Sequence, residues 1–263
     1  MKVCSWNINS VRLRENHVLK LLRENNPDVI CLQECKALVE DIPIDNFFKL
    51  GYKNIIARGQ KSYNGVAILA KVAFKEEFSL DFADLNQARH VAGILENGIT
   101  IHNFYVPAGG EEPDIKKNMK FAQKLRYLDD MQNWFKANKP KKSILVGDLN
   151  IAPYENDVWD HKKMSKVVSH TPAEIMSLFQ VMEAGDWIDL FRKNDASEKL
   201  YSWWSYRARD WIKANKGRRL DHIWSTSDLA KSNINNFILR EARGWERPSD
   251  HAPIFSVFER ICL

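Results

Sequence analysis

The sequence predicts an α+β fold in which two β-sheets pack as a sandwich with helices outside. Ten short apolar runs, most of them four to eight residues long, are rich in Val and Ile and are bounded by Gly, Asn, Asp or Pro, as strands are. Runs such as Ile30-Cys31-Leu32 are apolar at consecutive positions, which indicates strands covered on both faces. The chain has 263 residues, 44% of them hydrophobic, and we expect a single domain over residues 1–263.

The predicted strands share a β-branched, apolar composition and turn-forming residues at their ends. In chain order they are residues 2–6, 29–32, 54–57, 66–69, 91–95, 99–106, 143–146, 220–224, 236–239 and 253–258. No run approaches the roughly 18 apolar residues of a membrane span, so we expect no association with a membrane.

Three segments have the spacing of amphipathic helices. Residues 11–22 place Val and Leu on one face, and residues 25–27 end this helix with two Asn and a Pro. Apolar residues recur at spacings of four and three over residues 121–135. The third helix covers residues 173–182 and opens with Thr171 as its cap, followed by Pro. We interpret all three apolar faces as packing surfaces of the core.

Composition and charge exclude several classes of protein. The opening MKVCSWNIN lacks the basic and long apolar stretches of a signal peptide. Four cysteines do not make a disulfide framework, and Cys31 and Cys35 have no second Cys or His pair nearby to complete a zinc site. We therefore expect a cytoplasmic protein whose metal ligands are oxygen or imidazole. The net charge of +5 permits a polyanionic partner.

Polar side chains stand at the ends of many predicted strands. Taken singly, most are ordinary: Asn7 suits a turn, and Glu34 suits a solvated strand end. Asp221 is different, because an ionised carboxylate between Leu220 and Ile223 is costly to bury unless it is paired. The strand-end residues are Asn7, Glu34, Tyr105, Asp148, Asn150, Asp221, Asp250 and His251.

Together these residues form an oxygen-rich set with a single imidazole. Strands of one sandwich can bring their ends to a common rim, and such a donor set suits Mg²⁺ or Mn²⁺. A site of this kind carries out metal-assisted phosphoryl chemistry, in which a carboxylate or a carboxylate–His pair activates water. His251 follows Asp250 directly, and a carboxylate partner can fix its tautomer.

Six motifs in order give the chain a family resemblance. They are WNIN (6–9), LQE (32–34) followed by Lys36, YVPAGG (105–110), GDLNIAP (147–153), RLDHIW (219–224) and SDHAPI (249–254). The sequence resembles the exonuclease III group of abasic-site DNA repair endonucleases, within the endonuclease/exonuclease/phosphatase superfamily. The resemblance covers the chain from end to end. It implies a four-layer α/β-sandwich of two mixed sheets and a DNA repair nuclease that depends on Mg²⁺, with Mn²⁺ as a substitute.

The resemblance also implies roles for the strand-end residues. Glu34 would be the principal metal ligand, with Asn7 and Asp250 beside it, and Asp148 would orient or deprotonate the attacking water. Asn150 and Tyr105 would hold the scissile phosphate. Asp221 would hydrogen-bond His251, which would contact the phosphate or act as the base. The resemblance leaves open whether a second metal ion binds at Asp148, Asn150 and His251.

Residues 201–219 point to the substrate. This stretch carries five aromatic residues and six basic residues against one acid, and such a mixture can contact phosphates and stack on bases. By resemblance, Trp203 and Leu220 would form the pocket for a base-less deoxyribose; simple packing of Trp203 and Trp204 is the alternative. Other expected DNA contacts are Trp204, Arg207, Lys36, Tyr63, Asn64 and Arg89.

The sequence departs from the family at three positions. Cys35 stands where relatives commonly carry Thr, Arg218 where some have an apolar pocket residue, and Arg207 where others push a residue into the duplex. We expect a bacterial, monomeric enzyme that cuts 5′ to abasic sites and trims blocked 3′ ends on double-stranded DNA. The alternative is a phosphodiesterase or phosphatase of the same superfamily acting on RNA or on a phosphorylated lipid or inositol.

Overall fold

The computed structural model describes residues 1–193 and 197–259, so Cys262 lies outside the described residues. Sheet A contains, in spatial order, β13 (Asn233–Ile238), β14 (Ile254–Phe258), β1 (Lys2–Asn7), β2 (Val29–Gln33), β4 (Val66–Ala70) and β3 (Asn54–Arg58). Sheet B contains β5 (Phe74–Phe78), β6 (His90–Leu95), β7 (Thr100–Tyr105), β8 (Ser143–Asp148), β12 (Asp221–Ser225) and β9 (Ile188–Asp189). Both sheets are mixed, since β1 runs parallel to β2 and β7 parallel to β8 while the other pairs are antiparallel.

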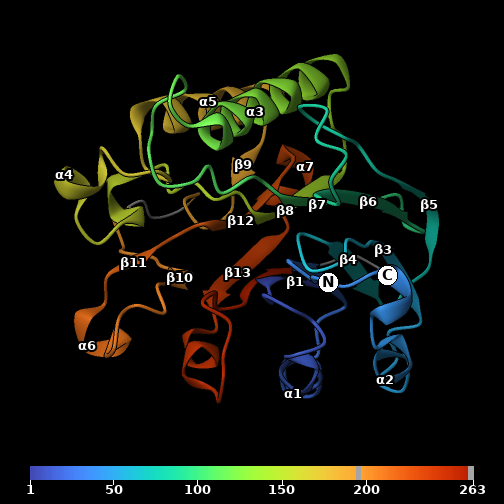
Figure 1. Ribbon diagram of the computed structural model, residues 1–263. Coiled ribbons are helices and arrows are strands. Elements are labelled where there is room, and N and C mark those ends of the chain that lie inside the picture. Colours follow the sequence, from blue (N-terminus) through green and yellow to red (C-terminus); the bar gives the residue numbers. More distant parts are fainter. Residues whose placement is uncertain (194–196, 260–263) are drawn as a thin grey trace.

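The two sheets pack face to face between two layers of helices (Figure 1). Helices α3 (Met119–Ala137) and α5 (Pro172–Ala184) cover sheet B, and α1 (Glu15–Asn25) and α2 (Ile44–Phe48) cover sheet A. The predicted four-layer α/β-sandwich is confirmed. Shorter helices are α4 (His161–Met164), α6 (Trp211–Ala214) and α7 (Ser227–Ala230), and β10 (Trp203–Trp204) pairs with β11 (Gly217–Arg218).

The core has three layers because successive strand residues point to opposite faces. Val29 and Cys31 of β2 lie in the core between the sheets, whereas Ile30 and Leu32 pack beneath α1. In the same way, β8 sends Ile144 and Val146 between the sheets and Leu145 toward α3 and α5. Both faces of these strands are buried, which explains why their sequences read as unbroken apolar runs.

The ten predicted runs all fall on strands, and the main differences concern boundaries. The first helix begins at Glu15, and Val11 lies buried in the turn before it. Strand β13 begins at Asn233 rather than at residue 236, because its first half is rich in Asn and lacks an apolar pattern. The predictions missed β5, which is polar in its middle, and the two-residue strands. Within the described part of the chain, no helix combines the length and apolarity needed to cross a membrane.

Candidate active site

Six strands deliver polar side chains to one rim of the sandwich, and one of them, β2, ends directly before Glu34. β1 ends at Asn7, β7 at Tyr105 and β8 at Asp148, and Tyr105 pairs in register with Asp148. β12 runs antiparallel to β8 and therefore begins where β8 ends, so that Asp221 pairs with Asp148. β14 is antiparallel to β1, which places His251, just before β14, at the same rim. The register of the two sheets thus decides which polar residues meet.

Glu34 is held by donors from both sheets. Tyr105 OH donates to Glu34 Oε1 at 2.7 Å, and Asn7 Nδ2 donates to the same oxygen at 3.0 Å. The Lys36 ammonium lies 2.8 Å from Glu34 Oε2. Burial alone would raise the pKa of Glu34, but the neighbouring Lys36 ammonium and these hydrogen bonds lower it below its ordinary value. Glu34 is therefore ionised at neutral pH.

Asp148 is an almost fully buried carboxylate of the rim. Asn7 Nδ2 donates to its Oδ2 at 2.8 Å, and the backbone N–H of Asn150 donates to its Oδ1 at 2.9 Å. Asn150 Nδ2 donates to Oδ2 at 3.2 Å. Burial, aided by the charge of Asp221, raises the pKa of Asp148 to about 7, although the His251 imidazolium works against this rise. Asp148 can therefore gain or lose a proton near neutral pH.

His251 is clamped between two carboxylates. Its Nδ1 donates to Asp221 Oδ2 at 2.8 Å, and its Nε2 lies 3.6 Å from Asp148 Oδ2. Ser202 Oγ also donates to Asp221 Oδ2, at 2.6 Å. Burial would lower the pKa of His251, but Asp221 and Asp148 raise it to about 10. At neutral pH the imidazole is therefore a cation that presents Nε2–H to the rim.

Asp250 stands beside this clamp. Asn9 Nδ2 donates to its Oδ1 at 3.0 Å, and Trp203 Nε1 donates to its Oδ2 at 2.9 Å. Lys36 Nζ in turn donates to Asn9 Oδ1 at 2.6 Å, which links Asp250 to the surroundings of Glu34. Burial would raise the pKa of Asp250, yet His251, Asn9 and Trp203 lower it below its ordinary value.

The rim has the donor chemistry of a site for a hard divalent cation. Asp148, Asp221 and His251 each offer a ligand atom, and these atoms lie within 4.8 Å of one another. Asp221 Oδ1 is buried and has no hydrogen-bond partner among the residues that the structure describes. Several carboxylates and amides in one place, with few compensating cations, suit a metal bound through oxygen. The residues present therefore fit a metal ion.

The residues expected to contact DNA divide into buried and exposed groups. Leu220 packs with Ala152 and Met164, and Trp203 lies half-buried beside this cluster. The guanidinium of Arg218 lies 5.0 Å from the centroid of the Trp203 ring. Trp204 is only 2% exposed and packs inward. This burial favours the alternative that Trp204 packs in the core instead of contacting DNA.

The other expected contacts lie on loops around the rim. Arg207 is 91% exposed and Tyr63 is 69% exposed, so both face solvent. Asn64 is buried and donates to Gln60 Oε1 at 2.8 Å. The guanidinium of Arg89 lies 4.9 Å from the centroid of the Tyr105 ring, beside the rim.

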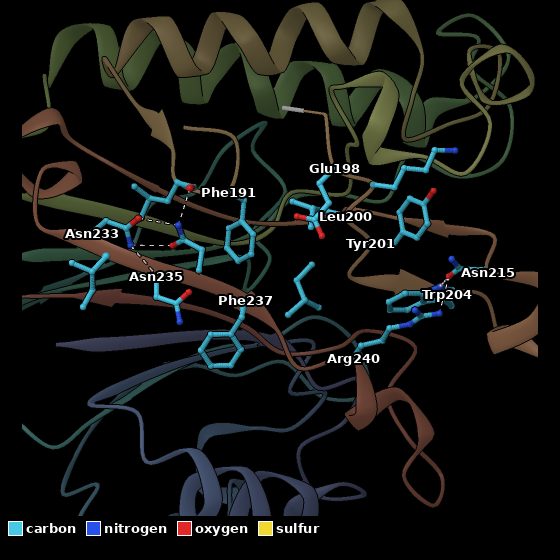
Figure 2. Close-up of a pocket in the computed structure, with 15 residues that line it drawn as sticks. Phe191, Glu198, Leu200, Tyr201, Trp204, Asn215, Asn233, Asn235, Phe237 and Arg240 are labelled. Atoms are coloured by element: carbon cyan, nitrogen blue, oxygen red, sulfur yellow. Dashed lines mark hydrogen bonds between the residues drawn. The ribbon is translucent and has the colours of Figure 1, made fainter. Parts of the chain in front are cut away.

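A cavity of about 560 Å³ lies elsewhere, between β13 and residues 190–191 and 198–201 (Figure 2). Phe191, Tyr201 and Phe237 supply aromatic rings, and Arg240 supplies a guanidinium at its edge. Of the described residues that line it, only Tyr201, Trp204 and Asn215 belong to the aromatic and basic stretch 201–219, and none belongs to the strand-end set. The cavity is thus separate from the acidic rim.

Comparison with known proteins identifies the family. Residues 4–251 match the model of the endonuclease/exonuclease/phosphatase family. The chain is 31% identical to exodeoxyribonuclease III of Haemophilus influenzae over 98% of its own length and 100% of that protein. The chain belongs to the endonuclease/exonuclease/phosphatase family, in the exodeoxyribonuclease III and AP endonuclease group. It is a nuclease.

Solved structures of this family agree with the assignment. An AP endonuclease from Archaeoglobus fulgidus superposes with a TM-score of 0.92 at 29% identity, covering 98% of this chain and 99% of that chain. The 3′ phosphatase NExo from Neisseria, bound to a product DNA hairpin, superposes with a TM-score of 0.91 at 28% identity and the same coverage.

Sequence reasoning missed several residues that organise this nuclease site. Asn9 lies within the WNIN motif, two residues after Asn7, and that spacing was the available signal. Ser202 gave no signal, because its bond to Asp221 depends on the pairing of β10 with β11. Lys124 falls within the helix predicted over residues 121–135 and carries no other signal, yet its ammonium reaches the backbone of Asn150.

Proposed function

We propose that this chain is a Mg²⁺-dependent DNA repair nuclease. It hydrolyses the phosphodiester 5′ to an abasic site in double-stranded DNA, and it trims blocked 3′ ends, acting as a monomer. The reaction is an in-line attack of water that leaves a 3′-hydroxyl and a 5′-phosphate. The supporting observation is that side chains from both sheets are hydrogen-bonded into one rim, through Tyr105 to Glu34 and Asn7 to Asp148.

The charges of the rim support one assignment of the proton transfer. A protonated His251, held by Asp221, cannot accept a proton from water but can donate to a phosphate oxygen. Asp148, with a pKa near 7, can take the proton of the attacking water. Asn150 and Tyr105 would donate to the oxygens of the phosphate as charge develops on them.

Glu34, Asn7 and Asp250 would hold the metal ion. When bound, Mg²⁺ supplies positive charge that offsets the negative charge of the scissile phosphate. Lys36 keeps Glu34 ionised and so prepares it as a ligand. A single ion at these three residues is the proposal, and a second at Asp148, Asn150 and His251 remains its alternative.

Residues 201–219, the aromatic and basic stretch before β12, would bind the DNA. Trp203 and Leu220 lie side by side near the rim, where a sugar without a base could enter. Exposed Arg207 and Tyr63 would contact the backbone of the duplex, with Lys36, Asn64 and Arg89 nearer the cut. The names of the relatives, which include AP endonucleases and a 3′ phosphatase, agree with such a substrate.

Incision of a defined duplex tests the proposal. A 5′-labelled duplex with one tetrahydrofuran abasic analogue should be cut with Mg²⁺ and left intact with EDTA, and a polymerase should extend the new 3′ end. Parallel substrates carry a 3′-phosphate, an undamaged sequence or an RNA strand. Asp148→Asn serves as the inactive control. Intact tetrahydrofuran and 3′-phosphate substrates, together with cleavage of the RNA strand, would favour the RNA-directed alternative.

A further inference from the structure

Lys124 and Glu174 form an ion pair directly behind the active site that the proposed hydrolysis does not use. Both side chains are fully buried, and the Lys124 ammonium donates to Glu174 Oε1. Lys124 lies on α3 and Glu174 on α5, so the pair joins the two helices that cover sheet B (Figure 1). Burying two charges is costly, and a well-packed apolar pair is often equally stable. The pair therefore calls for a reason other than stability.

The Lys124 ammonium also holds the loop that carries Asn150. Its Nζ donates to the backbone carbonyl of Asn150 at 2.8 Å and to that of Ala108 at 3.3 Å. Asn150 has a φ of +54°, a left-handed conformation that few residues other than glycine and asparagine adopt. A buried carbonyl needs a partner, so the ammonium fixes the direction of the peptide that follows Asn150.

The conformation of Asn150 matters because its side chain reaches the catalytic carboxylate. Asn150 Nδ2 donates to Asp148 Oδ2 at 3.2 Å and to the carbonyl of Val106 at 2.9 Å. Both bonds originate from the residue whose carbonyl Lys124 holds. Without this anchor the backbone at Asn150 would be less restrained, and so would the side chain that contacts Asp148 and that is proposed to bind the phosphate.

Glu174 keeps the ammonium in place and ties down a second turn. Its carboxylate accepts the backbone N–H of Ser169 at 2.9 Å and that of Thr171 at 3.1 Å. The carbonyl of Ser169 in turn accepts the N–H of Ala152 at 2.8 Å, two residues after Asn150. The ion pair therefore restrains residues 150–152 at two points: Lys124 bonds the carbonyl of Asn150, and Glu174 holds Ser169, which bonds Ala152.

The chain also leaves room for the lysine stem. Gly109 has a φ of +88°, and a Cβ at this position would lie 2.9 Å from Lys124 Cδ. This glycine follows Ala108, whose carbonyl the ammonium contacts. The Lys124 side chain thus runs from α3 to Asn150 between the backbone at Gly109 and the Glu174 carboxylate.

We propose that Lys124, held by Glu174, is a positioning residue that fixes Asn150 against Asp148 for hydrolysis. The inference deepens the proposed function and rests on it. Lys124 does not reach the substrate, and it acts through the backbone of Asn150. It should therefore affect the rate of the chemical step more than the binding of DNA.

The test uses the double variant Lys124→Met/Glu174→Gln, because Lys124→Met alone would leave a buried, unpaired carboxylate. Gln at position 174 keeps an acceptor for the start of α5. Met131→Ala is the matched control, since Met131 is buried on α3 two turns away and packs only in the helix-side core. We expect the double variant to lose roughly 10- to 100-fold in kcat with KM for DNA nearly unchanged. The control should melt at a lower temperature and keep its kcat.

A second measurement does not depend on activity. Amide hydrogen exchange of a peptide spanning residues 148–153 should be faster in the double variant than in the wild type, and unchanged in Met131→Ala. A double variant with wild-type kcat and wild-type exchange would overturn the positioning role. A wild type that cuts no DNA substrate would refute the proposed function instead, and the exchange comparison would then decide the positioning role alone.

Discussion

The carboxylates of the rim differ in pKa because each has different neighbours. Lys36 lowers the pKa of Glu34 against its burial, whereas burial raises the pKa of Asp148 to about 7. Groups whose pKa values are pushed apart can take separate roles, one as a metal ligand and one as a base. In the proposed function, electrostatics would therefore separate the roles of Glu34 and Asp148, and this can be tested one side chain at a time.

Replacing His251 with Asn should shift the pH dependence of cleavage. The imidazolium lowers the pKa of Asp148, so its removal raises that pKa above about 7. Because a base must be deprotonated, the acid limb of kcat/KM should move to higher pH, and the rate at pH 7 should fall roughly 10²- to 10⁴-fold. Rates measured from about pH 5 to 9 check this. An acid limb that stays in place would argue against Asp148 as the base.

Replacing Glu34 with Ala should weaken the use of metal. The variant loses a carboxylate ligand, so the Mg²⁺ concentration needed for half-maximal cleavage should rise, and part of the activity should return at high Mg²⁺. Titration of Mg²⁺ at saturating DNA measures the shift. Glu40→Ala, at an exposed acid on a nearby short helix, is the control and should titrate like the wild type. The same response in both variants would remove Glu34 from the metal site.

At the scale of elements, a buried amide network holds the two sheets together just below the rim. Gln33 Nε2, at the end of β2, donates to Asn103 Oδ1 on β7 at 2.7 Å. Asn103 Nδ2 donates to the carbonyls of Leu32 and Ala67, each at 3.0 Å. These bonds cross from one sheet to the other next to Glu34 and Tyr105, so they set the spacing at which the two halves of the site meet.

Asn103→Leu should therefore destabilise the sandwich strongly. The change leaves the Gln33 amide and two buried carbonyls without this partner, so the free energy of unfolding should fall by roughly 3 kcal/mol. Urea unfolding measures the loss. Ile101→Val, on the same face of β7, is the comparison and should cost only about 1 kcal/mol. Equal losses would show that packing, and not the amide network, joins the sheets here.

At the scale of the whole molecule, an imidazole pair sits within the aromatic core between sheet B and its helices. His90 Nε2 and His102 Nδ1 lie 3.2 Å apart, surrounded by rings that include Phe78 and Phe104. Burial lowers the pKa of His102 to about 3 and that of His90 well below its ordinary value. Both imidazoles are therefore neutral in the folded protein, whereas the unfolded chain protonates them below about pH 6.5.

This pair should make the protein sensitive to acid. A folded-state pKa below the unfolded value gives stability that is present above about pH 6.5 and is lost as the pH falls toward the folded pKa. His102→Leu should therefore reduce the loss of stability between pH 7 and pH 5 by about 2 kcal/mol. Urea unfolding at both values measures it. Phe104→Leu removes a ring from the same cluster without removing a titratable group. It should lower the free energy of unfolding by the same amount at pH 7 and at pH 5.

Because the chain carries a net charge of +5, its affinity for DNA should fall as the salt concentration rises. Arg207 is exposed to solvent, so Arg207→Ala should weaken binding and reduce the slope of log K against log salt by roughly 1. Binding of a labelled duplex, with EDTA present, at several salt concentrations gives the slope. Lys141→Ala, at an exposed lysine between α3 and β8, should leave the slope unchanged. An unchanged slope for Arg207→Ala would remove it from the interface.

Much of the fold was predictable because buried strands have a local signature. The apolar runs of β1, β2 and β8 can be recognised from composition and length alone, and polar residues at their ends indicated the site. β5 escaped because its middle is polar, and the first half of β13 because it is rich in Asn. The gathering of Glu34, Asp148 and His251 was expected from the motifs, and so was the hydrogen bond between Asp221 and His251. The hydrogen bonds that hold Glu34 and Asp148 were not predicted.

The amino-acid sequence by itself determined the strands, the order of the motifs and the kinds of chemical group available. Tertiary structure alone decided which groups are neighbours, because partners such as Lys124 and Glu174 lie 50 residues apart and meet only through the packing of α3 on α5. It also decided that Trp203 bonds Asp250 while Trp204 faces the core. Local patterns report what a residue can do, whereas burial and distance set its charge and its partner.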